Sequence, residues 1–222
     1  MPSDNSSRAQ KAALKLRIIM LLEAARLSGM NPLPAEILHN LAYFSNLLAP
    51  LWKLKPLDGK VLRLKRGPYY PDLQRQVDHL VATGLVTLSN LRYEQLADSG
   101  HWQVLADYRL DTSRAEPVLH CISSWEKEQS EFSFIRELML SISSLSDLQL
   151  KAVEIDDATY SSNVIGYGNV IDFGEWKNDN PSVDAAEYFQ KIMPGNIYLS
   201  RSNKLNFFIS HLAYRVDQRR LA

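Results

Sequence analysis

The chain has 222 residues, 45% of them hydrophobic, and its 25 basic residues balance 25 acidic ones. This length suits two small domains, and the apolar fraction is sufficient for hydrophobic cores. No apolar run approaches the roughly 18 residues of a membrane span, and the polar N-terminus lacks the apolar segment of a secretory signal, so we expect no membrane association. The single cysteine, Cys121, excludes internal disulfides and thiolate zinc clusters. We therefore expect a cytoplasmic protein with Cys121 in its core.

Charge is distributed unevenly along the chain. Residues 1–90 hold 12 basic and 6 acidic residues, a net charge of +6, whereas residues 91–222 hold 13 and 19, a net charge of −6. Such a change in sign is typical of a domain boundary. A basic surface binds phosphate backbones by releasing counterions, so any contact with DNA is expected in the first half.

The first elements are predicted to be helical. Residues 1–9 are polar, and we expect them to be disordered. Apolar residues at helical spacing predict a helix from Gln10 to Ser28, which Gly29 ends, and a second helix from Pro34 to about Leu48. A connector over residues 51–58 follows.

The stretch from Lys60 to Leu88 predicts a strand, a turn, a helix and a second strand. The first strand alternates, with Arg63 and Lys65 toward water, and Gly67-Pro68 is a turn signal. Pro71 suits the first position of a helix, and Gly84 is typical of its end. A helix between two short strands, after other helices, is the local plan of a winged-helix domain. In such a domain this helix is the recognition helix.

The wing and the domain boundary follow. We expect Asn90 to Tyr93 to form the tip of the wing and Trp102 to Leu110 to complete its sheet. The turn-rich stretch from Asp111 to Pro117 indicates the boundary. The predicted division is therefore a winged-helix domain over residues 10–112 and a mainly helical domain over residues 113–222. The predicted fold class is mainly α with small β, or α+β.

The second half is predicted to be mainly helical. Its expected elements are two helices or one broken helix over residues 118–144, a helix over 148–154 capped by Ser146-Asp147, a short hairpin within 164–173, a helix over 183–192 capped by Ser182, and a last helix over 204–220.

Basic residues of the predicted strand and recognition helix form a candidate DNA contact along a phosphate backbone. They are Lys60, Arg63, Lys65, Arg66 and Arg75. However, Asp72 and Asp78 on the same helix oppose phosphates. Non-specific DNA contact, sequence-specific recognition and protein docking therefore all stay open, and the mixed charge favours docking. The docking candidates on this helix are Gln74, Asp78 and His79.

The last helix is a second candidate surface, because it carries more apolar side chains than one face requires. Its docking candidates are Phe207, Phe208, Tyr214 and Arg215. The alternative, a buried closing helix of the second domain, fits the pattern better.

No catalytic, metal or cofactor site is predicted, and we expect no enzyme. The five histidines show no metal-ligand spacing, and no phosphate-binding loop or nucleophile elbow is present. Glu175-Trp176-Lys177, with Asp156 or Asp157 upstream, resembles part of a magnesium-dependent nuclease site. Lys177 runs directly into a turn, however, which argues against a strand position for this pair.

Several stretches together resemble the middle component of bacterial ABC-three-component defence systems, the group that includes Lamassu. These stretches are the early helix pair, KRGPYYPDLQRQVDHLVATGLV at 65–86, SDLQLKAVEIDDATY at 146–160 and NKLNFFISHLAYRV at 203–216. The resemblance implies a non-catalytic subunit that links an SMC-like ATPase to a nuclease effector in anti-phage or anti-plasmid immunity. It also implies docking on the ATPase, with non-specific DNA contact within the complex. The alternative is a winged-helix transcriptional regulator.

Overall fold

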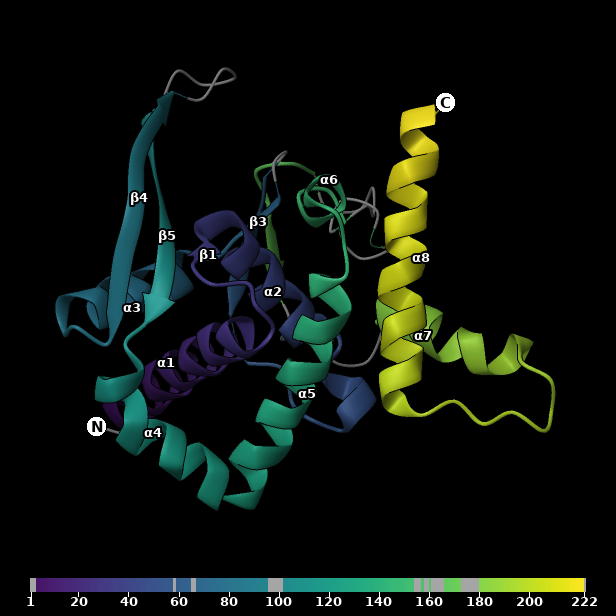
Figure 1. Ribbon diagram of the computed structural model, residues 1–222, viewed down its shortest axis with the longest axis horizontal. Helices are drawn as coiled ribbons and strands as arrows, with labels where there is room; N and C mark the ends of the chain where they lie inside the picture. Colours follow the sequence, from purple (N-terminus) through teal and green to yellow (C-terminus); the bar gives the residue numbers. More distant parts are fainter. Residues whose placement is uncertain are drawn as a thin grey trace.

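The computed structural model describes residues 3–57, 59–64, 67–95, 102–153, 157, 160, 166–172 and 180–221 (Figure 1). These residues are mainly helical and include two small antiparallel sheets, ordered β1-β5-β4 and β3-β2-β6. The expected mainly α, α+β class is confirmed at this level. The elements are α1 (Ser3–Leu27), β1 (Leu33–Pro34), α2 (Ala35–Leu47), η1 (Ala49–Trp52), β2 (Lys60–Leu64), β3 (Gly67–Tyr69), α3 (Pro71–Ala82), β4 (Val86–Gln95), β5 (Trp102–Leu110), α4 (Thr112–Ser124), α5 (Glu126–Ser143), α6 (Asp147–Leu150), β6 (Val170–Asp172), α7 (Pro181–Ile192) and α8 (Arg201–Leu221).

Helix α2 lies at the centre of the core. Every residue of this helix except Glu36 is buried. Its polar side chains have partners: Asn46 accepts a hydrogen bond from the backbone N–H of Leu57, and Ser45 accepts one from the guanidinium of Arg17 at 2.9 Å. Such pairing is required, because a buried polar group without a partner costs on the order of 1–3 kcal/mol. The predicted helix over 34–48 is thus confirmed, and it is more deeply buried than its apolar stripe suggested.

The N-terminal helix is longer than expected. It begins at Ser3 rather than Gln10, which corrects the expectation of disorder for residues 3–9. Extending an existing helix requires no new nucleation, so polar residues continue it readily.

Strands β4 and β5 form a long hairpin that projects from the helices (Figure 1). Asn90 to Tyr93 lie within β4 and not at the tip, which corrects the sequence prediction. Asn90 adopts a left-handed conformation at an irregularity in the register, and its side chain donates to Asp107 at 2.6 Å. A single left-handed residue therefore produces a bulge that the strand continues past.

The second sheet joins distant parts of the chain. Strand β6 pairs with β2, so residues 170–172 reach back to Lys60–Leu62 and do not form the local hairpin expected within 164–173. Gly67-Pro68 belongs to β3 rather than to a turn. Pairing between distant segments depends on the tertiary fold, which local alternation of residues does not report.

Two helices, α4 and α5, fill residues 112–143 and break at Trp125, as one of the two expected alternatives proposed. The turn-rich stretch at Asp111 is instead the start of α4, because the Asp111 side chain accepts from the N–H of Arg114 and caps the helix. Cys121 is exposed and not in the core, since α4 turns Ala115 and Ile122 inward.

The N-cap residues of α6 and α7 agree only in part with those predicted from the sequence. Ser146 caps α6, as predicted, and forms a capping box with Gln149. The helix ends at Leu150, earlier than the predicted 154. Asn180 caps α7 in place of the expected Ser182. Ser182 is buried and donates its hydroxyl to Asp157.

Buried polar contacts connect the two predicted domains. The Arg17 guanidinium pairs with Glu131 of α5 at 2.7 Å. The carboxylate of Asp157, which is fully buried, accepts from the hydroxyls of Tyr43 at 2.7 Å and Ser182 at 2.6 Å. One cluster of buried apolar residues also runs from α1 to α8. The domain boundary near residue 112 remains a prediction, and these contacts mean that the two halves pack as neighbours.

The Asp157 contacts lead to a stability prediction. Asp157→Ala removes the carboxylate that accepts hydrogen bonds from two buried hydroxyls and from the N–H of Tyr160, and it should lower the free energy of unfolding by about 3 kcal/mol. The measurement is urea denaturation followed by circular dichroism. Asp184→Ala, at an exposed site on α7, is the control and should cost less than about 1 kcal/mol. Equal losses in both variants contradict a connecting role for Asp157.

Candidate functional site

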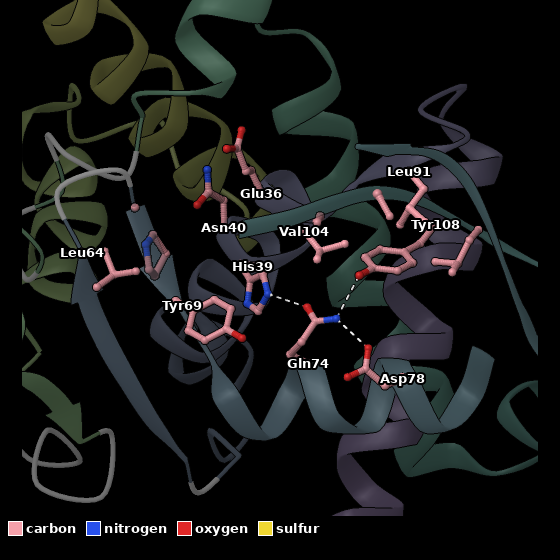
Figure 2. Close-up of a pocket in the computed structure, with 15 residues that line it drawn as sticks. Glu36, His39, Asn40, Leu64, Tyr69, Gln74, Asp78, Leu91, Val104 and Tyr108 are labelled. Carbon is pink, nitrogen blue, oxygen red and sulfur yellow. Dashed lines mark hydrogen bonds between the residues drawn. The ribbon is translucent and has the colours of Figure 1, made fainter. Parts of the chain in front are cut away.

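A groove opens between α2, α3 and the two hairpins formed by β2–β3 and β4–β5 (Figure 2). Its volume is about 530 Å³. We call it the docking groove and define it by its lining residues: Ala35, Glu36, His39, Asn40, Leu64, Gly67, Pro68, Tyr69, Gln74, Asp78, Leu88, Leu91, Val104, Ala106 and Tyr108. The groove therefore combines residues from distant parts of the first 110 residues.

A hydrogen-bonded network crosses the base of the docking groove (Figure 2). The backbone N–H of Tyr70 donates to Nδ1 of His39 at 3.2 Å, so the ring proton is on Nε2. Nε2 then donates to Oε1 of Gln74, also at 3.2 Å. The amide nitrogen of Gln74 donates in turn to Asp78 at 2.8 Å and to the Tyr108 hydroxyl at 2.9 Å. Every member of this chain has a defined donor or acceptor role.

The protonation state of His39 follows from its burial. Burial lowers the pKa of His39 to about 4, and the hydrogen bond with Gln74 only partly offsets this effect. His39 is therefore neutral near neutral pH, as its two hydrogen bonds require. Burial also raises the pKa of Tyr108 and of Tyr69, so both phenols keep their protons.

Apolar side chains of the β4–β5 hairpin form one wall of the groove. We call Leu88, Leu91 and Val104 the apolar wall; their side chains are 45%, 56% and 54% exposed. Alternation along β5 places Val104 and Tyr108 on one face, and the register pairs them with Tyr93 and Leu88. The irregularity between Ser89 and Arg92 brings Tyr93 to the same face as Leu88, although the two are five residues apart. This face of the hairpin is therefore exposed and apolar at Leu88, Tyr93 and Val104, whereas Ala106 and Tyr108 on the same face are buried.

The charges that line the groove are negative. Glu36 and Asp78 are carboxylates, and no lysine or arginine is among the described lining residues. With His39 neutral, Glu36 and Asp78 are the charged residues in the part of the lining that the structure describes. A ligand with positive charge is therefore favoured over a phosphate backbone.

The three described DNA-contact candidates, Lys60, Arg63 and Arg75, lie in different environments. Arg63 is buried and its guanidinium lies over the rings of Tyr160 and Tyr167, at 5.4 and 4.6 Å from their centroids, which corrects its predicted exposure. It shares a strand face with Val61, and that face is covered. Arg75 is exposed but pairs with Asp72. Lys60 is exposed, whereas Lys65 and Arg66 lie outside the described residues.

The docking candidates are placed in three environments. Gln74 and Asp78 line the docking groove, whereas His79 is exposed beside it. Phe208 is buried with Leu205 and Leu212 on the inner face of α8, so it is excluded as a docking residue. Phe207 is 42% exposed and stacks on Phe189, and Tyr214 and Arg215 are exposed.

The structure excludes Asp157 as a metal-binding acid of the nuclease-like pattern. The Asp157 carboxylate is enclosed by Tyr43 and Ser182 and does not reach solvent. Asp156, Glu175 and Lys177 lie outside the described residues. Within the described part of the chain, no three His, Cys, Asp or Glu residues are grouped to hold a metal ion. None of the described helices has both the length and the apolar character of a membrane span.

Comparisons with models of protein families, with curated proteins and with solved structures found no match for this chain. The family resemblance and the functions that it implies therefore rest on the quoted residues and stay predictions.

Sequence reasoning missed most of the groove. His39 was one of five scattered histidines, Leu88 and Val104 were assigned only to strands, and Leu91 was assigned to the tip of the wing. One signal was available: Leu91, Tyr93 and Val104 are large apolar residues in the predicted wing. Such side chains in an exposed hairpin indicate a contact surface.

The His39 network leads to a prediction about pH. The unfolded chain takes up a proton near the ordinary pKa of 6.5, whereas the folded chain does so only at about 4. The unfolded state binds more protons between these values, so stability falls as the pH drops through this window. From pH 7 to pH 5 the loss from His39 is about 2 kcal/mol.

Urea denaturation of the wild type and of His39→Gln at both pH values measures this loss. The stability advantage of the wild type should shrink by about 2 kcal/mol between pH 7 and pH 5, because glutamine does not titrate. An advantage that is the same at both pH values contradicts a neutral, buried His39.

Proposed function

We propose that this chain is a non-catalytic bridging subunit that links an SMC-like ATPase to a nuclease effector in anti-phage or anti-plasmid defence. The observation that carries the proposal is the docking groove, with its apolar wall and its two carboxylates. A groove with exposed apolar side chains is typical of a protein contact. The resemblance at residues 65–86 supplies the class of partner.

The N-terminal part is proposed to be a winged helix. Strand β1 lies between α1 and α2, and β5 pairs with both β1 and β4. Helix α3 directly precedes the β4–β5 hairpin. This order of helices and strands supports a winged-helix arrangement with α3 as recognition helix, β4–β5 as wing and β2–β3 as an inserted hairpin.

A bridging subunit needs two separate contact surfaces. The docking groove borders the β4–β5 hairpin, and α8 lies on the opposite side of the molecule (Figure 1). Helix α8 exposes Phe207, Tyr214 and Arg215. We propose that the ATPase binds at the docking groove and the effector at α8.

Co-expression tests the bridging role. The gene of this chain should lie beside a gene for an SMC-like ATPase, and the two products should elute together in size-exclusion chromatography. Tyr214→Asp should release the effector but retain the ATPase, because its site is on the opposite side from the groove. A chain that protects cells without an ATPase, or that never co-elutes with one, overturns the proposal.

The alternative, a DNA-binding regulator, predicts a different result. It requires salt-dependent binding of the isolated chain to one DNA sequence, weakened by Arg75→Ala. We expect no such preference, because Arg75 pairs with Asp72 and the face of α3 that lines the groove carries Asp78. Electrophoretic mobility shift with specific and random duplexes measures it. A duplex bound in preference by the wild type and lost with Arg75→Ala supports the regulator.

A further inference from the structure

We infer that the docking groove binds a short basic and apolar peptide segment of a partner protein. The segment presents apolar side chains to Leu88, Leu91 and Val104 and a lysine or arginine to Glu36 and Asp78. The inference rests on the proposed function in one respect, which is that the occupant belongs to another protein.

The apolar wall provides the first argument. The exposed apolar residues of the β4–β5 hairpin gather on one face: Leu88, Leu91 and Val104 line the groove and Tyr93 pairs with Val104. Thr87, Ser89 and Arg92 are the polar residues that alternate with them on β4. Exposed apolar side chains gathered on one face mark a contact surface in soluble proteins. Val104 points toward His39 and Gln74 across the groove (Figure 2), so an occupant meets apolar and polar groups at once.

The polar groups of the groove provide the second argument. Asp78 uses Oδ1 to accept from Gln74, and its other oxygen forms no ion pair with a described residue. Tyr108 accepts from Gln74 and keeps its own proton for a ligand carbonyl. The network through His39 fixes both side chains before a ligand arrives. Such preorganisation lowers the entropy that binding costs.

Charge decides between classes of occupant. Among the described lining residues, the two carboxylates repel phosphate and attract an ammonium or guanidinium group, and His39, which is neutral, adds no positive charge. A nucleic acid is therefore disfavoured at this site. A second copy of the chain is the other competing occupant, and its test is the oligomeric state.

Selection from random linear peptides displayed on phage, with the full chain immobilised, tests the inference. Enriched peptides should carry a lysine or arginine close to leucine, isoleucine or phenylalanine. No enrichment, or enrichment of peptides without a basic residue, overturns the inference. Neither result depends on the ATPase, so the bridging proposal stands or falls separately by co-elution.

Variants then locate the bound peptide. Fluorescence anisotropy of one enriched peptide should show binding weakened about tenfold or more in Leu91→Asp. Glu36→Gln combined with Asp78→Asn should weaken binding and reduce its dependence on salt, because the ionic attraction is lost. The matched control is Leu148→Asp on α6, since Leu148 has the same exposed fraction of 56% as Leu91.

Three results contradict this assignment. The first is a peptide that binds Leu91→Asp as tightly as the wild type. The second is a wild-type dimer in sedimentation velocity that Leu91→Asp converts to a monomer, because the groove is then occupied by a second copy. The third is a DNA oligonucleotide whose binding Leu91→Asp abolishes, which makes the groove a nucleic-acid site.

Discussion

The burial of α2 on nearly every side is the constraint on which the rest of the structure depends. A helix in this position has no solvent to satisfy its polar side chains, so each must find a partner in a neighbouring element. Asn46 meets the Tyr70 hydroxyl, and Arg17 meets Ser45 and Glu131. These bonds position α1, α5 and the segment before α3 around one helix. Removing one partner of the buried Arg17 pair is expected to be far costlier than any exposed substitution.

The same constraint shapes the docking groove. His39 belongs to α2 and to the groove at once, and it receives the Tyr70 N–H immediately before α3 begins. Its second nitrogen orients Gln74, which in turn holds Asp78 and Tyr108. The geometry of the surface is thus set by a core residue. The polar base of the groove is therefore anchored in the core, whereas its apolar wall lies on a two-stranded hairpin.

The net charge of a segment does not predict the charge of the surface that the segment forms in the fold. Residues 1–90 carry a net charge of +6, which suggested a phosphate-binding face. In the fold, Arg63 is buried between two tyrosines and Arg75 pairs with Asp72. The groove itself carries only carboxylates among its described charged residues. Binding responds to where charges lie, and a sum along the chain does not contain that information.

The sequence by itself determined the features that depend on neighbouring residues. The amphipathic period and Pro71 located α3, the predicted cap at Ser146 located the start of α6, and the break between α4 and α5 was among the expected alternatives. Only the tertiary structure decided the pairing of β6 with β2 and the burial of Arg63. The same holds for the hydrogen bond between Tyr43 and Asp157 and for the network around His39. The physical reason is distance along the chain. Helical periodicity and caps act within a few residues, whereas these contacts arise between segments that meet only when the core closes around α2.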